Sequence, residues 1–197
     1  MIEHVFLLLL GLERNYSTPS AGMQPTIMIG DVYPARSYRL FGHIGPMVFA
    51  APPRPGDIVV FRRITNEDYI KRVVALSGDR VQMKAGRLFI NGVMIERREL
   101  GSFEDENSYG EAIEVTRYEE TLPNGVVHLI NEISDDGPLD DTEEYIVPDG
   151  HMFVMGDNRD RSADSRVTSQ VGFVPLTAAV AMLPPSGPTV YWTRAGQ

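Results

Sequence analysis

Four segments of the chain carry the serine, lysine and carboxylate side chains that could do acid–base or nucleophilic chemistry. They are residues 19–26, 55–61, 69–79 and 156–166. Taken singly, each has an ordinary explanation. A strand lysine such as Lys71 can extend its ammonium to solvent from a sheet edge, and the charges of the last segment can form surface ion pairs worth about 0–1 kcal/mol each. Their combination is therefore the informative observation.

The four segments, in this order and rough spacing, resemble the successive sequence boxes of bacterial type I signal peptidases, and the resemblance runs over about residues 17–175. The first box of that family ends Ser-x-Met-x-Pro-Thr. Met23, Pro25 and Thr26 match it, but Gly22 stands where the family has its nucleophilic serine. The resemblance implies a serine/lysine endopeptidase that removes signal peptides from exported preproteins, here with the nucleophile missing.

The same resemblance implies roles for other residues. The family's general base is the lysine of Tyr-Ile-Lys-Arg, which falls on Lys71, and Ser20 matches a serine whose hydroxyl helps the residue 22 N–H to form the oxyanion hole. The box at residues 156–166 matches a serine that hydrogen-bonds near the lysine, and residues of a structural ion pair. The supporting residues expected from it are Asp157, Ser162, Asp164 and Arg166.

Chemistry explains why such a set is needed. A serine hydroxyl is a weak nucleophile, so a neighbouring base must accept its proton. Lysine can do this when burial lowers its pKa from ~10.4 toward ~7–8, and Ile70, Val73 and Val74 are the neighbours that would bury Lys71. Each oxyanion donor contributes about 3–4 kcal/mol, whereas loss of the nucleophile costs a factor of about 10⁶ in turnover.

Ser20 is a poor substitute for the missing nucleophile. Two residues apart in an extended strand, Ser20 and residue 22 face the same side but lie ~6.6 Å apart, while proton transfer needs placement within ~3 Å. A register shift would be required, and it would also remove the oxyanion donor.

The elements that position these residues are predicted to be strands. Glycine (18) and proline (14) are scattered between short β-branched clusters, which indicates a mostly β, antiparallel body with little helix. Segments 57–61 and 69–74 read as a hairpin, and Asn91-Gly92 suits a type I′ turn. The nearest helical candidate, residues 176–183, is expected to hold at most one or two turns.

Charge divides the chain into two parts. Of the net charge of −9, residues 99–144 carry fifteen acids and only one base, Arg117. We expect a smaller acidic β lobe, residues 97–144, inserted into a β body of residues 1–96 plus 145–197, with the lobe solvated and no nucleic-acid partner.

The remaining composition excludes several kinds of site. Without cysteine there is no disulfide, thiolate zinc site or cysteine nucleophile. No metal and no cofactor are expected, because the histidines are widely separated and form no i, i+4 pair; they are His4, His43, His128 and His151.

The resemblance implies a location at the extracytoplasmic, periplasmic face of a membrane. The apolar run at residues 5–12 is eight residues long, and a spanning helix needs about 20. We therefore expect a buried or membrane-grazing strand, or the remnant of an anchor, so that a full N-terminal anchor is not visible. Tyr191 and Trp192 are candidates for the lipid-facing surface, or equally for core or tail.

Three functional readings remain open on the sequence. The first is the signal peptidase implied by the resemblance. The second is a pseudopeptidase that binds signal peptides or a membrane partner without cutting, through strand addition along residues 68–73. The third is a specialised serine/lysine relative, such as a pilin-maturation protease or a self-cleaving repressor, although no DNA-reading helix or basic patch favours the repressor.

Overall fold

The computed structural model describes residues 13–37, 52–63, 65–106 and 109–183. The apolar run at residues 5–12 and the pair Tyr191 and Trp192 lie outside this part. No helix of the described residues is long and apolar enough to cross a membrane.

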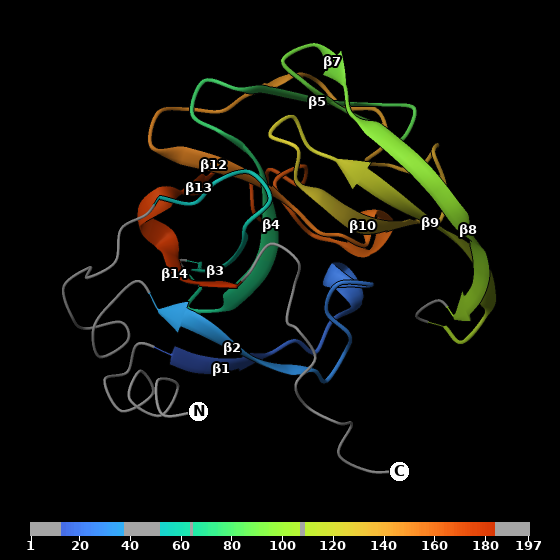
Figure 1. Ribbon diagram of the computed structural model, residues 1–197, viewed down its shortest axis with the longest axis horizontal. Helices are drawn as coiled ribbons and strands as arrows, with labels where there is room; N and C mark the ends of the chain where they lie inside the picture. Colours follow the sequence, from blue (N-terminus) through green and yellow to red (C-terminus); the bar gives the residue numbers. More distant parts are fainter. Residues whose placement is uncertain (1–12, 38–51, 64, 107–108, 184–197) are drawn as a thin grey trace.

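Seven strands form the largest sheet, in the order β1-β2-β14-β3-β4-β12-β13, with antiparallel neighbours throughout (Figure 1). Ser37 Oγ donates to the carbonyl of Val180, which ties β2 to β14. The bounds are β1 Glu13–Ser17, β2 Val32–Ser37, β3 Ile58–Arg62, β4 Asp68–Leu76, β12 His151–Met155, β13 Val174–Pro175 and β14 Ala179–Leu183.

A four-stranded antiparallel sheet, β11-β5-β6-β7, continues the body. Its bounds are β5 Arg80–Lys84, β6 Arg87–Ile90, β7 Val93–Met94 and β11 Tyr145–Ile146. Asn91 and Gly92 both have positive φ, 54° and 79°, as the type I′ turn between β6 and β7 requires. After the acidic segment the chain joins this sheet again at Tyr145, which pairs with Val81 of β5.

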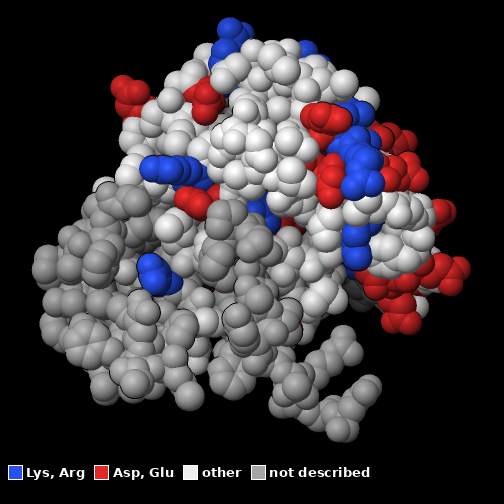
Figure 2. All heavy atoms as spheres, viewed as in Figure 1, with Lys and Arg blue, Asp and Glu red and all other residues white. Residues whose placement is uncertain are grey.

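The acidic segment forms a sheet of its own, β10-β9-β8, also antiparallel. Its strands are β8 Glu96–Glu106, β9 Ala112–Thr121 and β10 Val127–Glu132. Figure 2 shows Asp and Glu side chains gathered on the side of the molecule where β8 and β9 lie in Figure 1. Treating residues 97–144 as an inserted lobe remains a proposal.

The described residues contain three short 3₁₀ turns and no α-helix: η1 Ala21–Met23, η2 Arg159–Arg161 and η3 Leu176–Ala178. The mostly β fold predicted from the sequence is confirmed, as is the hairpin of β3 and β4. In the segment expected to be helical, one 3₁₀ turn gives way to β14, because Ala179 to Leu183 complete the sheet between β2 and β3.

Strand β4 is the centre of the body. Its burial runs without a break from Ile70 to Ala75, so both of its faces are covered. Val74 and Ala75 pack in the core shared with the four-stranded sheet, while Val73 packs with β3 and β12. Two cations, Lys71 and Arg72, fall inside this buried run, and their neighbours must compensate for them.

A buried ion pair joins the acidic sheet to η2. Glu120 of β9 and Arg159 are 1% exposed each, and both carboxylate oxygens of Glu120 accept hydrogen bonds from the guanidinium. His128 Nε2 lies 3.3 Å from the same carboxylate. Burial alone would raise the pKa of Glu120, but Arg159 and His128 hold that pKa below its usual range.

Glu120→Gln should therefore destabilise the fold by about 3–5 kcal/mol, since it leaves Arg159 buried without its counter-charge. Chemical denaturation measures this directly. The matched control is Glu119→Gln, one residue away, whose pair with Arg98 is partly exposed and should change stability by less than about 1 kcal/mol. Equal effects of the two substitutions would contradict this account of the junction.

Candidate active site

Turns η1 and η2 bring residue 22 against Lys71 and Ser162. The Gly22 carbonyl accepts the N–H of Asn158 at 3.2 Å. A Cβ added at residue 22 would lie 3.4 Å from Lys71 Nζ, 3.3 Å from the Arg161 carbonyl oxygen and 3.7 Å from Ser162 Cα. Three of the residues singled out in the sequence, from segments far apart in the chain, thus share one place.

Lys71 is buried without a counter-ion. The residue is 6% exposed, and its Nζ donates to the backbone carbonyl of Ile70 at 3.0 Å. Within the part of the chain that the structure describes, no carboxylate lies within ion-pair distance of Nζ. Burial lowers the pKa of Lys71, and the more distant charges of Asp164 and Asp157 oppose this only in part. The arrangement favours an amine that can lose its proton.

Arg72, the next residue of β4, is also buried, but it has a carboxylate as its partner. It is 1% exposed, and its Nε and Nη2 donate to the two oxygens of Asp157 at 2.8 and 2.7 Å. Nη1 donates to the Gly56 carbonyl at 2.7 Å, and the Thr26 hydroxyl donates to Asp157. Although burial would raise the pKa of Asp157, Arg72 holds it below its usual range, which fixes this carboxylate as the partner of Arg72.

A second buried pair shapes the other wall. Arg166 Nε and Nη2 each donate to Asp164 at 2.9 Å, and the Gly156 N–H donates to Asp164 Oδ2 at 3.0 Å. Ser162 Oγ is buried and has no hydrogen-bond partner among the described residues. A hydroxyl with unused capacity therefore lies in the turn that packs against residue 22.

Ser20 is not part of this cluster in the structure. It is exposed, and its hydroxyl lies 3.3 Å from that of Thr18. The assumption that residues 20–22 are extended is wrong beyond Ser20, because the chain turns into η1 at Ala21 and the Gln24 N–H donates to the Ala21 carbonyl at 3.0 Å. The distance expected for an extended strand therefore does not apply here, and within the described residues the hydrogen bonds of Ser20 are to Thr18 and not to Lys71.

Glycine at residue 156 is required by a close approach. A Cβ there would overlap Ser162 Oγ, Ser162 Cβ and the Gly22 carbonyl oxygen. Asn158 and Gly156 thus hold residue 22 in place, a role that the sequence reading did not give them. The Gly-Asp-Asn pattern was the available signal, but it also fits an ordinary turn.

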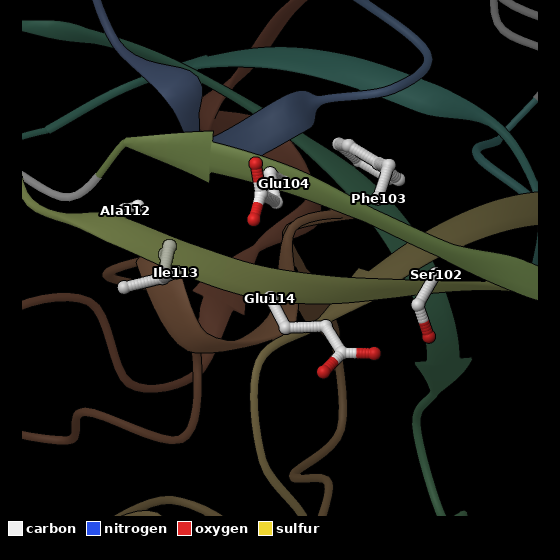
Figure 3. A pocket seen from close by; sticks show the side chains of 6 residues that line it. All are labelled: Ser102, Phe103, Glu104, Ala112, Ile113 and Glu114. Carbon is white, nitrogen blue, oxygen red and sulfur yellow. The ribbon is translucent and has the colours of Figure 1, made fainter.

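The pocket drawn in Figure 3 lies elsewhere, on the β8–β9 hairpin of the acidic sheet. Its lining contains none of the residues described above. It is formed by Ser102, Phe103, Glu104, Ala112, Ile113 and Glu114.

Comparisons with known proteins agree on one family. The profile described as "Signal peptidase, peptidase S26" matches residues 2–183. A protein named Signal peptidase I from Rickettsia felis is 35% identical over 186 residues, which cover 84% of this chain and 68% of the relative. One of the same name from Rickettsia canadensis is 36% identical over 187 residues, with the same coverage.

A solved signal peptidase I from Enterococcus faecalis V583 is 25% identical and covers 67% of this chain and 97% of its own, with a TM-score of 0.38. That superposition is too loose to bear on the site.

Gly156→Ala should destabilise the protein by about 1–3 kcal/mol or more, because the added methyl must displace Ser162 and the residue 22 backbone together. Thermal or urea unfolding checks the loss. An unchanged midpoint would mean that the two turns have room to separate, and the packing argument for residue 22 would then fail.

Proposed function

The chain belongs to the signal peptidase family S26, a family of serine endopeptidases, and from this premise we propose that it binds the signal peptides of exported preproteins at a serine/lysine site from which the nucleophilic oxygen is missing. In this proposal Lys71 is the general base and residue 22 is the nucleophile position. The chain as written recognises its substrate but does not cut it.

The observation that carries the proposal is the 3.4 Å separation between a Cβ built at residue 22 and Lys71 Nζ. A serine Oγ sits about 1.4 Å beyond its Cβ, so rotation about χ1 brings it within hydrogen-bond reach of Nζ. Gly22 is not among the glycines with positive φ, so the backbone there suits a serine. Only the Arg161 carbonyl must yield slightly.

The chemistry would follow from this placement. A neutral Lys71 amine accepts the proton of the residue 22 hydroxyl as that oxygen attacks the peptide carbonyl. The developing oxyanion would be held by the residue 22 N–H, with the Ser20 hydroxyl as the second donor implied by the family. With glycine at residue 22 these groups remain, but no bond to the substrate carbon can form.

An open sheet edge supports the substrate-binding half of the proposal. Strand β12 pairs with β4 only from Arg72 to Leu76, so the stretch from Asp68 to Lys71 has β3 on one side and no described strand on the other. Val73 uses both its N–H and its carbonyl on the β3 side. Because the backbone groups of successive strand residues point to alternate sides, the N–H and carbonyl of Ile70 point to the side without β3. An extended signal peptide would add there as a further strand.

The cellular location of the site is also part of the proposal. Signal peptides are met at the lipid surface, so we assign this site to the extracytoplasmic face of a membrane. Small side chains of the peptide would enter pockets beside the added strand. A nucleic-acid partner is not proposed.

Gly22→Ser should convert the inert chain into a peptidase, with a gain of about 10⁶ in turnover set by the cost of losing a nucleophile. The assay is cleavage of a preprotein in detergent. Gly22→Ala is the matched control, because it adds the Cβ without the oxygen and should stay inactive. Cleavage by the unaltered chain would sink this account of the nucleophile.

The base is tested in the Gly22→Ser background. Lys71→Ala should abolish cleavage and Lys71→Arg should not restore it, since a guanidinium does not deprotonate in proteins. Binding of a labelled signal peptide to the unaltered chain, measured by fluorescence anisotropy, completes the test. Turnover retained by either Lys71 variant would place the base elsewhere, and a chain that binds no signal peptide would overturn the recognition half.

The pH profile of the Gly22→Ser variant should also report Lys71. Only the neutral amine accepts a proton, so kcat/KM should rise with pH through the lowered pKa of Lys71 and level off below 10.5, the ordinary value for lysine. Because the folded-state pKa is depressed, the charged form is the one that folding disfavours. A midpoint at 10.5 or above would show that burial does not activate this lysine.

A further inference from the structure

Three carboxylates, one of them in η2, converge in the described part of the chain. Glu132 ends β10, Asp140 lies in the loop that follows, and Asp160 lies in η2 itself. One oxygen from each lies within 4.8 Å of the other two. These residues are separated in the chain and are brought together only by folding.

Two of the three carboxylates are buried with unused oxygens. Glu132 is 2% exposed and Asp140 is 0% exposed. Among the described residues, neither oxygen of Glu132 nor Oδ1 of Asp140 has a hydrogen-bond partner. A buried carboxylate without a hydrogen-bond partner costs several kcal/mol if it stays charged, so these groups must take up either protons or a cation.

The other oxygens are fixed by the backbone. Asp140 Oδ2 accepts the N–H of Gly137 at 2.7 Å. Asp160 Oδ2 accepts the N–H groups of Ile133 and Ser134 at 2.6 and 3.2 Å. The loop therefore holds the carboxylates in position before anything binds to them.

One nearby cation does not balance the charge. Arg97 Nη1 lies 3.5 Å from Glu132 Oε1, but its Nη2 is already bound to both oxygens of Asp135, at 2.8 and 2.7 Å. With all four carboxyl groups ionised, Glu132, Asp135, Asp140 and Asp160 against one arginine would leave three negative charges, so the cluster without a cation favours a protonated Glu132. Burial, with a smaller contribution from the charges of Asp160 and Asp140, raises the pKa of Glu132 to about 9.

The arginines on the body side are also committed. Arg159 is bound to Glu120 and Arg166 to Asp164, although their charges partly offset the rise at Glu132.

We propose that Glu132, Asp140 and Asp160 bind a calcium ion. Calcium takes six to eight oxygen ligands at about 2.3–2.6 Å in a flexible shell, and carboxylate oxygens that all lie within 4.8 Å of one another can share one such ion. Three protein carboxylates favour calcium over magnesium, which is usually held by one or two. Magnesium holds its ligands at about 2.0–2.1 Å and demands a tighter octahedron. Water and loop carbonyls would complete the calcium shell.

The ion would tie the acidic sheet to the candidate active site. Asp160 sits between Asn158, whose N–H donates to the Gly22 carbonyl, and Ser162, which packs against residue 22. Joining η2 to the loop at residues 132–140 would hold the turn that positions residue 22. No metal was expected from the sequence, because the histidines are dispersed and cysteine is absent, whereas this set is made of carboxylates.

Calcium binding is measured on the full chain after treatment with a chelator. Isothermal titration should give one calcium per chain, and calcium at about 100-fold excess over its dissociation constant should raise the melting temperature by about 5 °C or more. Magnesium at equal concentration should do much less. Neither measurement depends on peptide cleavage, so the calcium site is tested separately from the proposed function.

Asp140→Asn should weaken calcium binding by about 10-fold or more and remove most of the thermal shift. Asp160→Asn, which can still accept from the two loop N–H groups, is a second variant should the first fail to fold. Glu143→Gln is the matched control, because it makes the same charge change at an exposed position nearby and should keep the full response.

Three results would overturn the calcium site. One is a melting temperature of the parent that does not change when calcium is added. If Asp140→Asn is also more stable than the parent in chelator, the cluster holds a proton instead of an ion. The others are equal shifts in the parent and in Asp140→Asn, and equal shifts with magnesium and calcium.

Discussion

The candidate active site depends on the burial of Lys71, which has no counter-ion among the residues that the structure describes. Lys71 and Arg72 are neighbours in the central strand, and both are almost completely enclosed. Arg72 is matched by both oxygens of Asp157, whereas Lys71 meets a backbone carbonyl. A pair such as Arg72–Asp157 keeps its charge, while an unpaired ammonium in the same setting loses much of its preference for the proton. Neighbouring residues of one strand point to opposite faces of the sheet. Arg72 therefore stays charged beside Asp157, while burial lowers the pKa of Lys71 on the other face.

The second constraint is the close approach of two turns. Residue 22 reaches Lys71 because η1 packs directly on the segment from Gly156 to Ser162, with the Asn158 N–H bound to the Gly22 carbonyl. The absence of a side chain at Gly156 permits this contact. The buried pairs Arg72–Asp157 and Arg166–Asp164 brace both sides of that segment, so charge pairing and small size act together.

Much of this could be predicted from the sequence, and the rest could not for identifiable reasons. Short β-branched runs and Asn91-Gly92 gave the strands and the turn, since those signals are local. The resemblance brought Gly22, Lys71 and Ser162 into one hypothesis. The turn at Ala21 was missed because small residues adopt extended or 3₁₀ backbone equally well. The carboxylates of Glu132 and Asp160 were not associated, because only the pairing of distant segments brings them together.

Glycine at residue 22 has no structural justification in the backbone, and this is what gives the residue its functional meaning. Other glycines of the chain occupy positive φ, where a side chain would be strained, and Gly156 is confined by its neighbours. Residue 22 has neither reason: its φ suits any amino acid, and the nearest obstacle to a Cβ is a carbonyl 3.3 Å away. The fold therefore places a buried lysine and a buried serine, Lys71 and Ser162, around a position that would accept a hydroxyl. Under the proposed function, such a site would hold a peptide without cutting it, because the surroundings of the reactive atom are present and the atom itself is not.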